Sequence, residues 1–248
     1  MANFNRTASA LDIVQNVQGQ LALPVSGAAV TAPNDETAQQ LVRLLTWCGR
    51  KLIKPTSTYR WSHLLKTWVL ITDPLLKLYP LPEDWDSFED LTGWNFTSRL
   101  PMLGPASDPQ WQCLLARTMG SSTLSVIYRT RGGKFELSAT YSTPQELRID
   151  YSSRAWVKTN DPLNPLRDYI AADDDLVLYD NELITAKLKL AFLTSKGFDT
   201  AAAQGEYDEL EEAAICADSD APVLGVSRAD AYPLISTQFN APDTGFGG

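Results

Sequence analysis

The sequence has few of the residues on which most recognisable metal sites and active sites depend. Its 248 residues include 1 histidine and 3 cysteines, which are Cys48, Cys113 and Cys216. No two cysteines have the short spacing of a metal-binding pair, and an odd number suits a reducing compartment better than a disulfide framework. The single histidine, His63, lies in an aromatic segment, where a lone histidine is more often structural than catalytic. The sequence therefore predicts no metal centre and no cofactor.

Positive charge and long apolar runs are also scarce. The chain has 21 Lys and Arg residues against 30 Asp and Glu residues, a formal net charge of −9. This balance argues against sequence-independent binding of nucleic acid, because such binding needs clustered basic residues. It allows passive contact with DNA. No apolar run approaches the roughly 20 residues that span a bilayer. The first residues also lack the pattern of a signal peptide. We expect a protein made in a cytosol, without a membrane partner.

Motifs of catalysis are missing as well. No serine stands in a G-x-S-x-G turn, and neither Gly132-Gly133 nor Gly247-Gly248 has the context of a phosphate loop. The densest group of acids is 173–175 with Asp180 and Glu182. Such a group could hold a divalent cation, but it lacks the regular spacing of a calcium loop. We interpret these acids as residues at a helix N-terminus, where the macrodipole favours negative charge. The sequence therefore predicts no enzymatic activity.

Helical periodicity is clear in four segments. Thr7 or Ser9 can cap a first helix, and Asn34-Asp35 opens a second helix that Pro55 ends. A third helix covers 180–196. A fourth follows Asp199, with an expected apolar side made of Ala202, Tyr207, Leu210, Ala213, Ala214 and Ala217. The short break between the last two favours an antiparallel helical hairpin.

Strand-like composition is found between these helices. Residues 66–71 form one predicted strand and 75–79 its return strand. Residues 123–130 and 134–140 are predicted to form a hairpin around Gly132-Gly133, and residues 147–151 a third strand of the same small sheet. A short helix is expected from Ser107 onward, with a proline in its first turn. This order of elements is typical of the α+β class.

The predicted fold is an antiparallel helical bundle with an inserted small antiparallel β-sheet domain and an extended C-terminal arm. Its expected parts are an N-terminal helical pair at 1–57, an aromatic-rich region with the sheet at 58–160, a helical hairpin at 161–217 that packs on the N-terminal helices, and the arm at 218–248. The 30 residues from 219 onward could reach on the order of 100 Å if fully extended.

The arm has little charge but several separated large apolar residues. Extended segments with such anchors bind grooves or add to sheet edges, so we expect the arm to bind a portal protein or a neighbouring subunit. The predicted anchors are Val223, Leu224, Val226, Tyr232, Leu234, Ile235, Phe239 and Phe246.

Aromatic residues are plentiful, with 7 tryptophans in the chain. Four of them fall within 61–94. They could line a ligand groove, as in a carbohydrate-binding module or a hydrolase. In a sheet packed on helices they are more often core residues, and in an assembling protein they are also interface anchors.

Several motifs occur in an order that resembles one known family. They include 81–86 (LPEDWD), 94–101 (WNFTSRLP), 103–105 (LGP), 131–134 (RGGK), 149–157 and 173–176, followed by the helix at 180–196. This series resembles phage head-to-tail adaptor proteins, the family that includes the podophage tail accessory factor. The residues that carry the motifs, with an expected structural role, are Trp85, Trp94, Arg99, Pro101, Gly104, Pro105, Tyr151 and Trp156.

The resemblance implies a virion protein of the neck, or head-tail connector, that is present in the host cytoplasm during assembly. Its family members form a homo-oligomeric ring, usually a dodecamer, which binds below the portal, extends the DNA ejection channel and offers a platform to the tail nozzle or tail tube. They have no catalytic residues to carry over. The long C-terminus and Phe96 depart from the family pattern. The alternatives are another tail-completion or nozzle ring component and, less favoured, a carbohydrate-binding or hydrolytic tail module.

Overall fold

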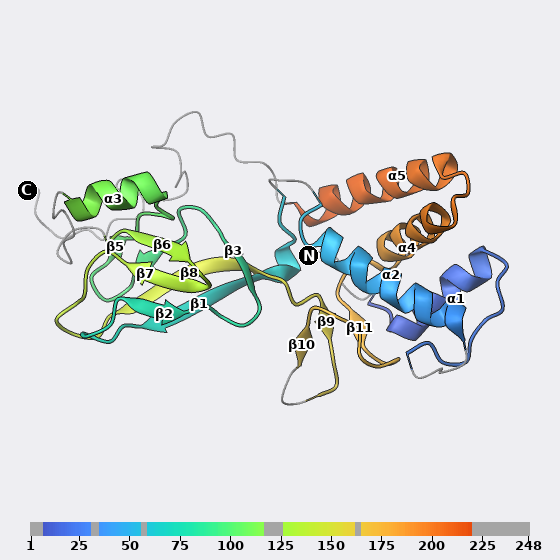
Figure 1. The fold of residues 1–248 in the computed structure, drawn as a ribbon, viewed down its shortest axis with the longest axis horizontal. Helices are drawn as coiled ribbons and strands as arrows, with labels where there is room; N and C mark the ends of the chain where they lie inside the picture. Colours follow the sequence, from blue (N-terminus) through green and yellow to red (C-terminus); the bar gives the residue numbers. More distant parts are fainter. Residues whose placement is uncertain (1–6, 31–34, 56–58, 117–125, 162–164, 220–248) are drawn as a thin grey trace, which may run out of the picture. The chain divides into compact units, whose positions relative to one another are not determined.

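The computed structural model describes residues 7–30, 35–55, 59–116, 126–161 and 165–219. Its helices are α1 (Ala10–Gln20), α2 (Glu36–Leu52), α3 (Asp108–Ala116), α4 (Asn181–Lys196) and α5 (Ala201–Asp218), with a 3-10 turn at Ser62–Leu64. Small antiparallel sheets lie between α2 and α4 in the sequence, so the chain is mixed α+β, as predicted (Figure 1).

The helix ends follow from local side-chain chemistry. The Ser9 hydroxyl accepts a hydrogen bond from the Asp12 backbone N–H at 3.1 Å, and the Asp12 carboxylate accepts one from the Ser9 N–H, which closes a capping box. Asp35 caps α2 by accepting the Ala38 N–H at 3.0 Å. Asp180 caps α4, and Gly197 ends it in a left-handed conformation with φ of 72°. These predicted ends are confirmed.

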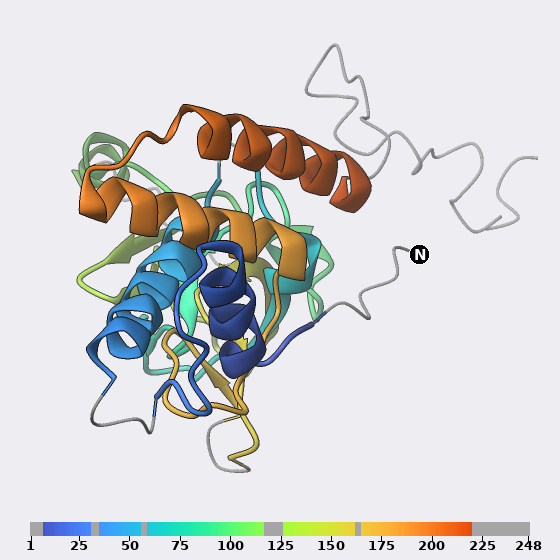
Figure 2. The ribbon, with the colours of Figure 1, turned by 90° about the vertical axis from the view of Figure 1, so that its right-hand side faces the viewer.

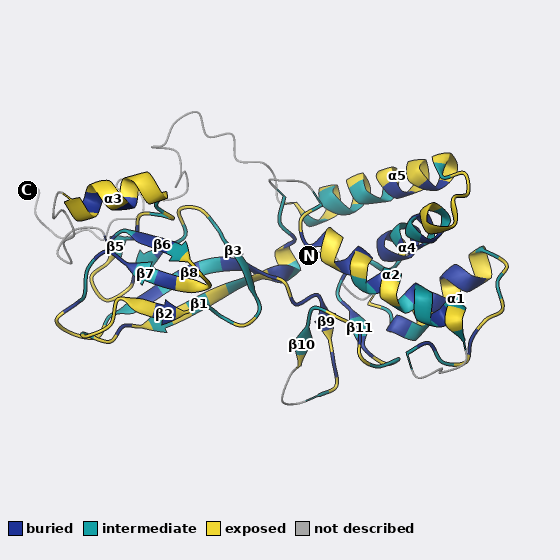
Figure 3. Cartoon of the chain, viewed as in Figure 1, coloured by how far each residue is buried: buried dark blue, intermediate teal, exposed yellow. Residues whose placement is uncertain are grey.

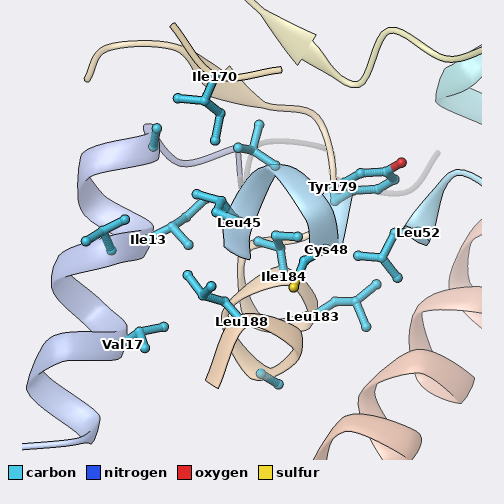
Figure 4. Packing of buried hydrophobic residues seen from close by; sticks show 14 of the residues in the cluster. Ile13, Val17, Leu45, Cys48, Leu52, Ile170, Tyr179, Leu183, Ile184 and Leu188 are labelled. Atoms are coloured by element: carbon cyan, nitrogen blue, oxygen red, sulfur yellow. The ribbon is translucent and has the colours of Figure 1, made fainter. Parts of the chain in front are cut away.

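Four helices share one hydrophobic core. Figure 4 shows side chains of three of them directed toward one another: Ile13 and Val17 from α1, Leu45 and Cys48 from α2, and Ile184 and Leu188 from α4. Helix α5 lies beside α4 and adds Ala203 and Tyr207 (Figure 2). Helix α4 thus packs on α1 and α2, and α5 packs on α4. The antiparallel bundle predicted from the sequence is not confirmed.

The apolar side of α5 was predicted correctly only in part. Tyr207 is buried, and Leu210 and Ala214 pack against the core, as expected. Ala202, Ala213 and Ala217 are exposed, and α5 faces solvent over much of its surface (Figure 3). The buried side runs through Ala203 instead, four residues before Tyr207. Alanine gives a weak apolar signal, because it is small enough to suit either side of a helix.

The largest sheet has the strand order β1-β8-β4-β5, and β3 also pairs with β8. The bounds of these strands are β1 Leu65–Ile71, β3 Trp85–Phe88, β4 Trp94–Asn95, β5 Leu100–Pro101 and β8 Glu146–Ser153. Strand β1 pairs with β8 along its whole length, from Leu65 opposite Ser152 to Ile71 opposite Glu146. Within the described residues β8 is the only strand paired with β1, so β1 is an edge of the sheet.

Two smaller sheets complete the fold. One has the order β2-β7-β6 and the other β10-β9-β11. The strands are β2 Leu78–Pro80, β6 Tyr128–Arg131, β7 Lys134–Leu137, β9 Val157–Lys158, β10 Leu166–Arg167 and β11 Leu176–Val177. The predicted hairpin of β6 and β7 is confirmed: Gly132 and Gly133 take φ of 59° and 71° in its two-residue turn.

Two predicted strand pairings are wrong. Residues 75–79 do not return along β1; β2 begins at Leu78 and pairs with β7. Strand β8 pairs with β1, β3 and β4 rather than with the β6–β7 hairpin. Alternation in a sequence shows which side chains share a face, but it does not show which strand lies next to which.

The five-stranded sheet and the β2-β7-β6 sheet bury a second hydrophobic core between them. From the five-stranded sheet, Leu147 and Ile149 of β8 are buried there and Trp68 of β1 packs against them. From the other sheet comes Phe135 of β7, whose ring meets that of Trp68 edge-on at 5.2 Å between centroids. One face of β1 and β8 thus packs on the second core, and the opposite face points away from this core.

Candidate interaction surfaces

The outward face of β1 is unusually apolar for an exposed strand. Leu65, Val69 and Ile71 are 41%, 50% and 60% exposed, and they share one face of the strand because they are separated by even numbers of residues. The segment that follows adds Leu75, which is 89% exposed. We call these four residues the β1 surface. Long apolar edge strands are sites at which other chains associate.

On the same face of the sheet, the neighbouring strand β8 carries an ion pair and a cation–π contact. Arg148 of β8 stands opposite Val69 and pairs with Glu146 at 2.5 Å between Nη2 and Oε1. Its guanidinium carbon lies 4.2 Å from the centre of the Phe96 ring, which is 51% exposed. Apolar residues bordered by such charged groups are typical of protein–protein interfaces.

A second exposed aromatic residue lies on α2. Trp47 is 50% exposed, and Arg43 and Lys51 stand four residues before and after it, so the three side chains share one face of the helix. The Lys51 ammonium lies 5.9 Å from the centre of a Trp47 ring. We call these three residues the Trp47 ridge. One side of the ridge borders a pocket of about 490 Å³, whose apolar wall includes Leu44 and Leu190.

A larger groove, of about 910 Å³, opens between α1, α4 and α5. Its lining includes small side chains, among them Ala186 and Ala213, and its acids are Glu182, Glu206 and Glu209. We call it the acidic groove. Glu206 forms an ion pair with Lys189 at 2.7 Å, and in the described part of the chain no basic side chain is paired with Glu209. The groove therefore presents negative charge beside apolar side chains.

His63 is held in an aromatic cluster rather than in an open cleft. Its ring centre lies 5.8 Å from that of Trp61 and 5.5 Å from that of Tyr179. Asp218, at the end of α5, accepts hydrogen bonds from the Tyr59 hydroxyl at 2.6 Å and from the Ser62 N–H at 2.8 Å. These bonds fasten the end of α5 to the segment around His63. Burial tends to raise the pKa of Asp218, but the hydrogen bonds outweigh it and the pKa is lowered.

We expect the stability of the fold to fall as the pH drops from about 6.5 toward 4. Burial lowers the pKa of His63 from 6.5 to about 4, against the opposing effect of Asp218. Between these values the unfolded chain binds a proton that the folded chain does not, so the free energy of unfolding is highest above pH 6.5 and decreases by at most about 3 kcal/mol. Chemical denaturation at pH 7 and pH 4.5 measures the change. His63→Phe keeps an aromatic ring and should show a smaller decrease; an equal decrease in both proteins would contradict the assignment.

The acids at 173–175 do not lie at a helix N-terminus, so that interpretation is wrong for them. Asp173 accepts the backbone N–H groups of Ala29 and Val30, and Asp175 accepts those of Ala171 and Ala172. They organise two loops by satisfying backbone donors. Only Asp180 and Glu182 are at a helix start. In the described ranges, no three His, Cys, Asp or Glu side chains are grouped so that they could hold a metal ion.

Among the motif residues, Trp156 and Tyr151 are buried and form specific contacts. The Trp156 Nε1–H donates to the Asp168 carbonyl at 3.1 Å, and its ring stacks on Tyr179 at 5.9 Å. The Tyr151 hydroxyl donates to the Asp84 carboxylate at 2.9 Å.

Gly104 is required by close packing, because an added Cβ would lie 2.6 Å from the Tyr128 carbonyl oxygen and the backbone has φ of 156°. Pro105 follows it and is exposed.

The other motif residues lie on or beside β3, β4 and β5. Trp94 of β4 stands opposite Pro101 of β5, and both are partly buried. Arg99 is exposed in the turn between these strands, with φ of 58°. Trp85 is partly buried at the start of β3.

Of the motif residues, Trp156 belongs to the helical core and Gly104 packs against Tyr128 of the second core, while the others lie on or beside the strands of the largest sheet. The structure therefore does not bring them together at one site.

The eight arm residues proposed as anchors, Val223 to Phe246, lie outside the described residues. In the part that is described, no helix is both long and apolar enough to cross a bilayer.

No protein-family model matches this sequence, and no curated protein sequence matches it significantly.

Sequence reasoning missed the Trp47 ridge and the β1 surface. A signal for the ridge was present: with Leu41, Leu45 and Cys48 on the buried side of α2, Trp47 falls on the opposite side. The β1 surface could not be found in this way, because both faces of β1 are apolar and alternation does not tell which one is covered.

Proposed function

We propose that this chain is a structural protein of a phage virion, a head-to-tail adaptor that forms a ring below the portal. The ring would extend the DNA channel and offer a docking platform to the tail nozzle or tail tube. In this proposal the helical part is an antiparallel bundle that supports the sheets, and the chain carries out no catalysis.

The observation that carries the proposal is the β1 surface. A seven-residue edge strand with three exposed large apolar side chains favours pairing with another chain over contact with water. Natural sheets usually protect such edges, so an edge that no other described strand covers supports the presence of a partner. The collinear motifs of the sequence supply the identity of that partner, a portal or a further adaptor subunit.

The acidic composition supports the same proposal. A wall with excess negative charge repels phosphate, so packaged DNA can pass without adhering to it. With a net charge of −9, the chain suits contact with DNA that is passive rather than binding.

Mixing the purified chain with the portal ring encoded in the same genome tests the proposal. Native mass spectrometry should show one complex that carries a full ring of this chain, expected to be twelve copies from the family resemblance. A portal ring that keeps its own mass would contradict the adaptor assignment. Binding to a tail tube or nozzle ring, but not to the portal, would favour the alternative of another tail-completion component.

A further inference from the structure

The Trp47 ridge and the acidic groove are complementary surfaces on different sides of the same helical core. The ridge lies on α2, whereas the groove lies between α1, α4 and α5. We propose that the Trp47 ridge of one copy of this chain docks into the acidic groove of the next copy. This inference deepens the proposed function, on which it rests, by naming the contact that builds the ring.

The chemistry of the two surfaces matches. The ridge offers a half-exposed indole with a cation on either side, and neither Arg43 nor Lys51 forms an ion pair in the described part of the chain. The groove is lined by apolar side chains, which include Ala186, Leu210 and Ala213, and by carboxylates. An indole buried against these apolar side chains would leave both cations next to acids, so apolar burial and charge pairing act together.

The size of the groove also suits this occupant. Its volume of about 910 Å³ is in the range of sites that enclose a drug-sized group, which is larger than one indole. Small residues on three of its sides, including Gly19, let the backbone of a second helix come close. The remaining room can take the aliphatic parts of Arg43 and Lys51.

A contact between two different surfaces has a definite consequence for assembly. Identical patches that face one another give a closed dimer, whereas a ridge and a groove on different parts of the chain give a head-to-tail contact. Repeated head-to-tail contacts form a ring when the rotation between copies closes. The chain therefore contains, within its described residues, the kind of interface that an adaptor ring needs.

Charge reversal with complementation tests the contact. The ridge variant carries Arg43→Glu and Lys51→Glu, and the groove variant carries Glu182→Lys and Glu209→Lys. Arg131→Glu with Lys134→Glu, in the exposed turn of the β6–β7 hairpin, changes the charge as much as the ridge variant but far from it in sequence. Sedimentation velocity at low salt, over concentrations up to about 1 mM, measures self-association of each protein and of an equimolar mixture of the ridge and groove variants.

We expect the wild-type chain and the hairpin control to associate, each more weakly as salt is raised. The ridge and groove variants should each associate at least about tenfold more weakly. Their mixture should recover, because every ridge then meets a groove of opposite charge. The inference is overturned if the wild type stays monomeric at about 1 mM, if the variants associate as the wild type does, or if the mixture does not recover.

Portal binding separates this inference from the proposed function. If the ridge and groove variants still form complete rings on the portal, the contact is wrong and the adaptor assignment stands. If the wild type self-associates through the ridge but does not bind the portal, the contact stands and the adaptor assignment fails. Thermal unfolding of each variant, compared with the wild type, identifies any loss of folding.

Discussion

Gly49→Ala is expected to destabilise the fold by about 3 kcal/mol or more. Gly49 lies on the buried side of α2, where a Cβ atom would be 2.3 Å from Cζ2 of Trp156 and 2.4 Å from Cε2 and Cη2. The Trp156 ring cannot easily move away, since it is fully buried and its Nε1–H is hydrogen-bonded to the Asp168 carbonyl. Chemical denaturation of the variant and the wild type measures the loss.

A second substitution distinguishes this clash from a general effect of alanine. Trp156→Phe removes part of the ring that the new methyl group would meet, so Gly49→Ala should cost at least about 1 kcal/mol less in that background. Gly205→Ala is the matched control, because Gly205 is inside α5 with no atom within 4 Å of an added Cβ. The control should stabilise by up to about 1 kcal/mol. Equal losses from Gly49→Ala in both backgrounds would contradict the account.

Deletion of 222–248 is expected to weaken portal binding by at least about 100-fold while leaving the unfolding free energy unchanged. Ordering the backbone of the arm costs about 1–2 kcal/mol per residue, and burial of its apolar anchors on a partner, at about 1.5–3 kcal/mol each, offsets part of that cost. Main-chain hydrogen bonds to a sheet edge or groove of the partner would supply the rest of the affinity. The described residues of both hydrophobic cores all precede 219, and we expect them to hold the fold after the deletion.

A point-substitution pair refines the deletion. Leu234→Asp with Ile235→Asp should reproduce much of the loss, because it places charge where the arm is expected to bury apolar groups. Ser236→Asp with Thr237→Asp adds the same charge between anchors and should have a much smaller effect. Portal binding at full strength after the deletion would refute the role of the arm, and equal effects of the two pairs would refute the role of its anchors.

Helices were easier to predict from this sequence than sheets, for a physical reason. Caps such as Ser9, Asp180 and Gly197 act within one helical turn, so the sequence shows both the residue and its partner. The hairpin at Gly132-Gly133 is equally local. The pairing of β1 with β8, by contrast, joins Leu65 to Ser152 and depends on packing of the whole domain.

The interaction surfaces were less predictable still. Aromatic residues were expected in the core or at interfaces, yet composition alone could not separate Trp156, which is fully buried, from Trp47, which is half-exposed. The difference lies in the neighbours: Trp156 has Gly49 and Tyr179 against its faces, whereas Trp47 has solvent and two cations. Such surroundings are set by tertiary structure.

The central proposal is that copies of this chain form a ring that links the portal to the tail. Cryo-electron microscopy of virions that contain the chain tests it most directly. The account predicts a ring below the portal in which each subunit fits the described fold and has its Trp47 ridge against a neighbouring subunit. Density for this fold elsewhere in the particle, or subunits that do not touch one another, would contradict it.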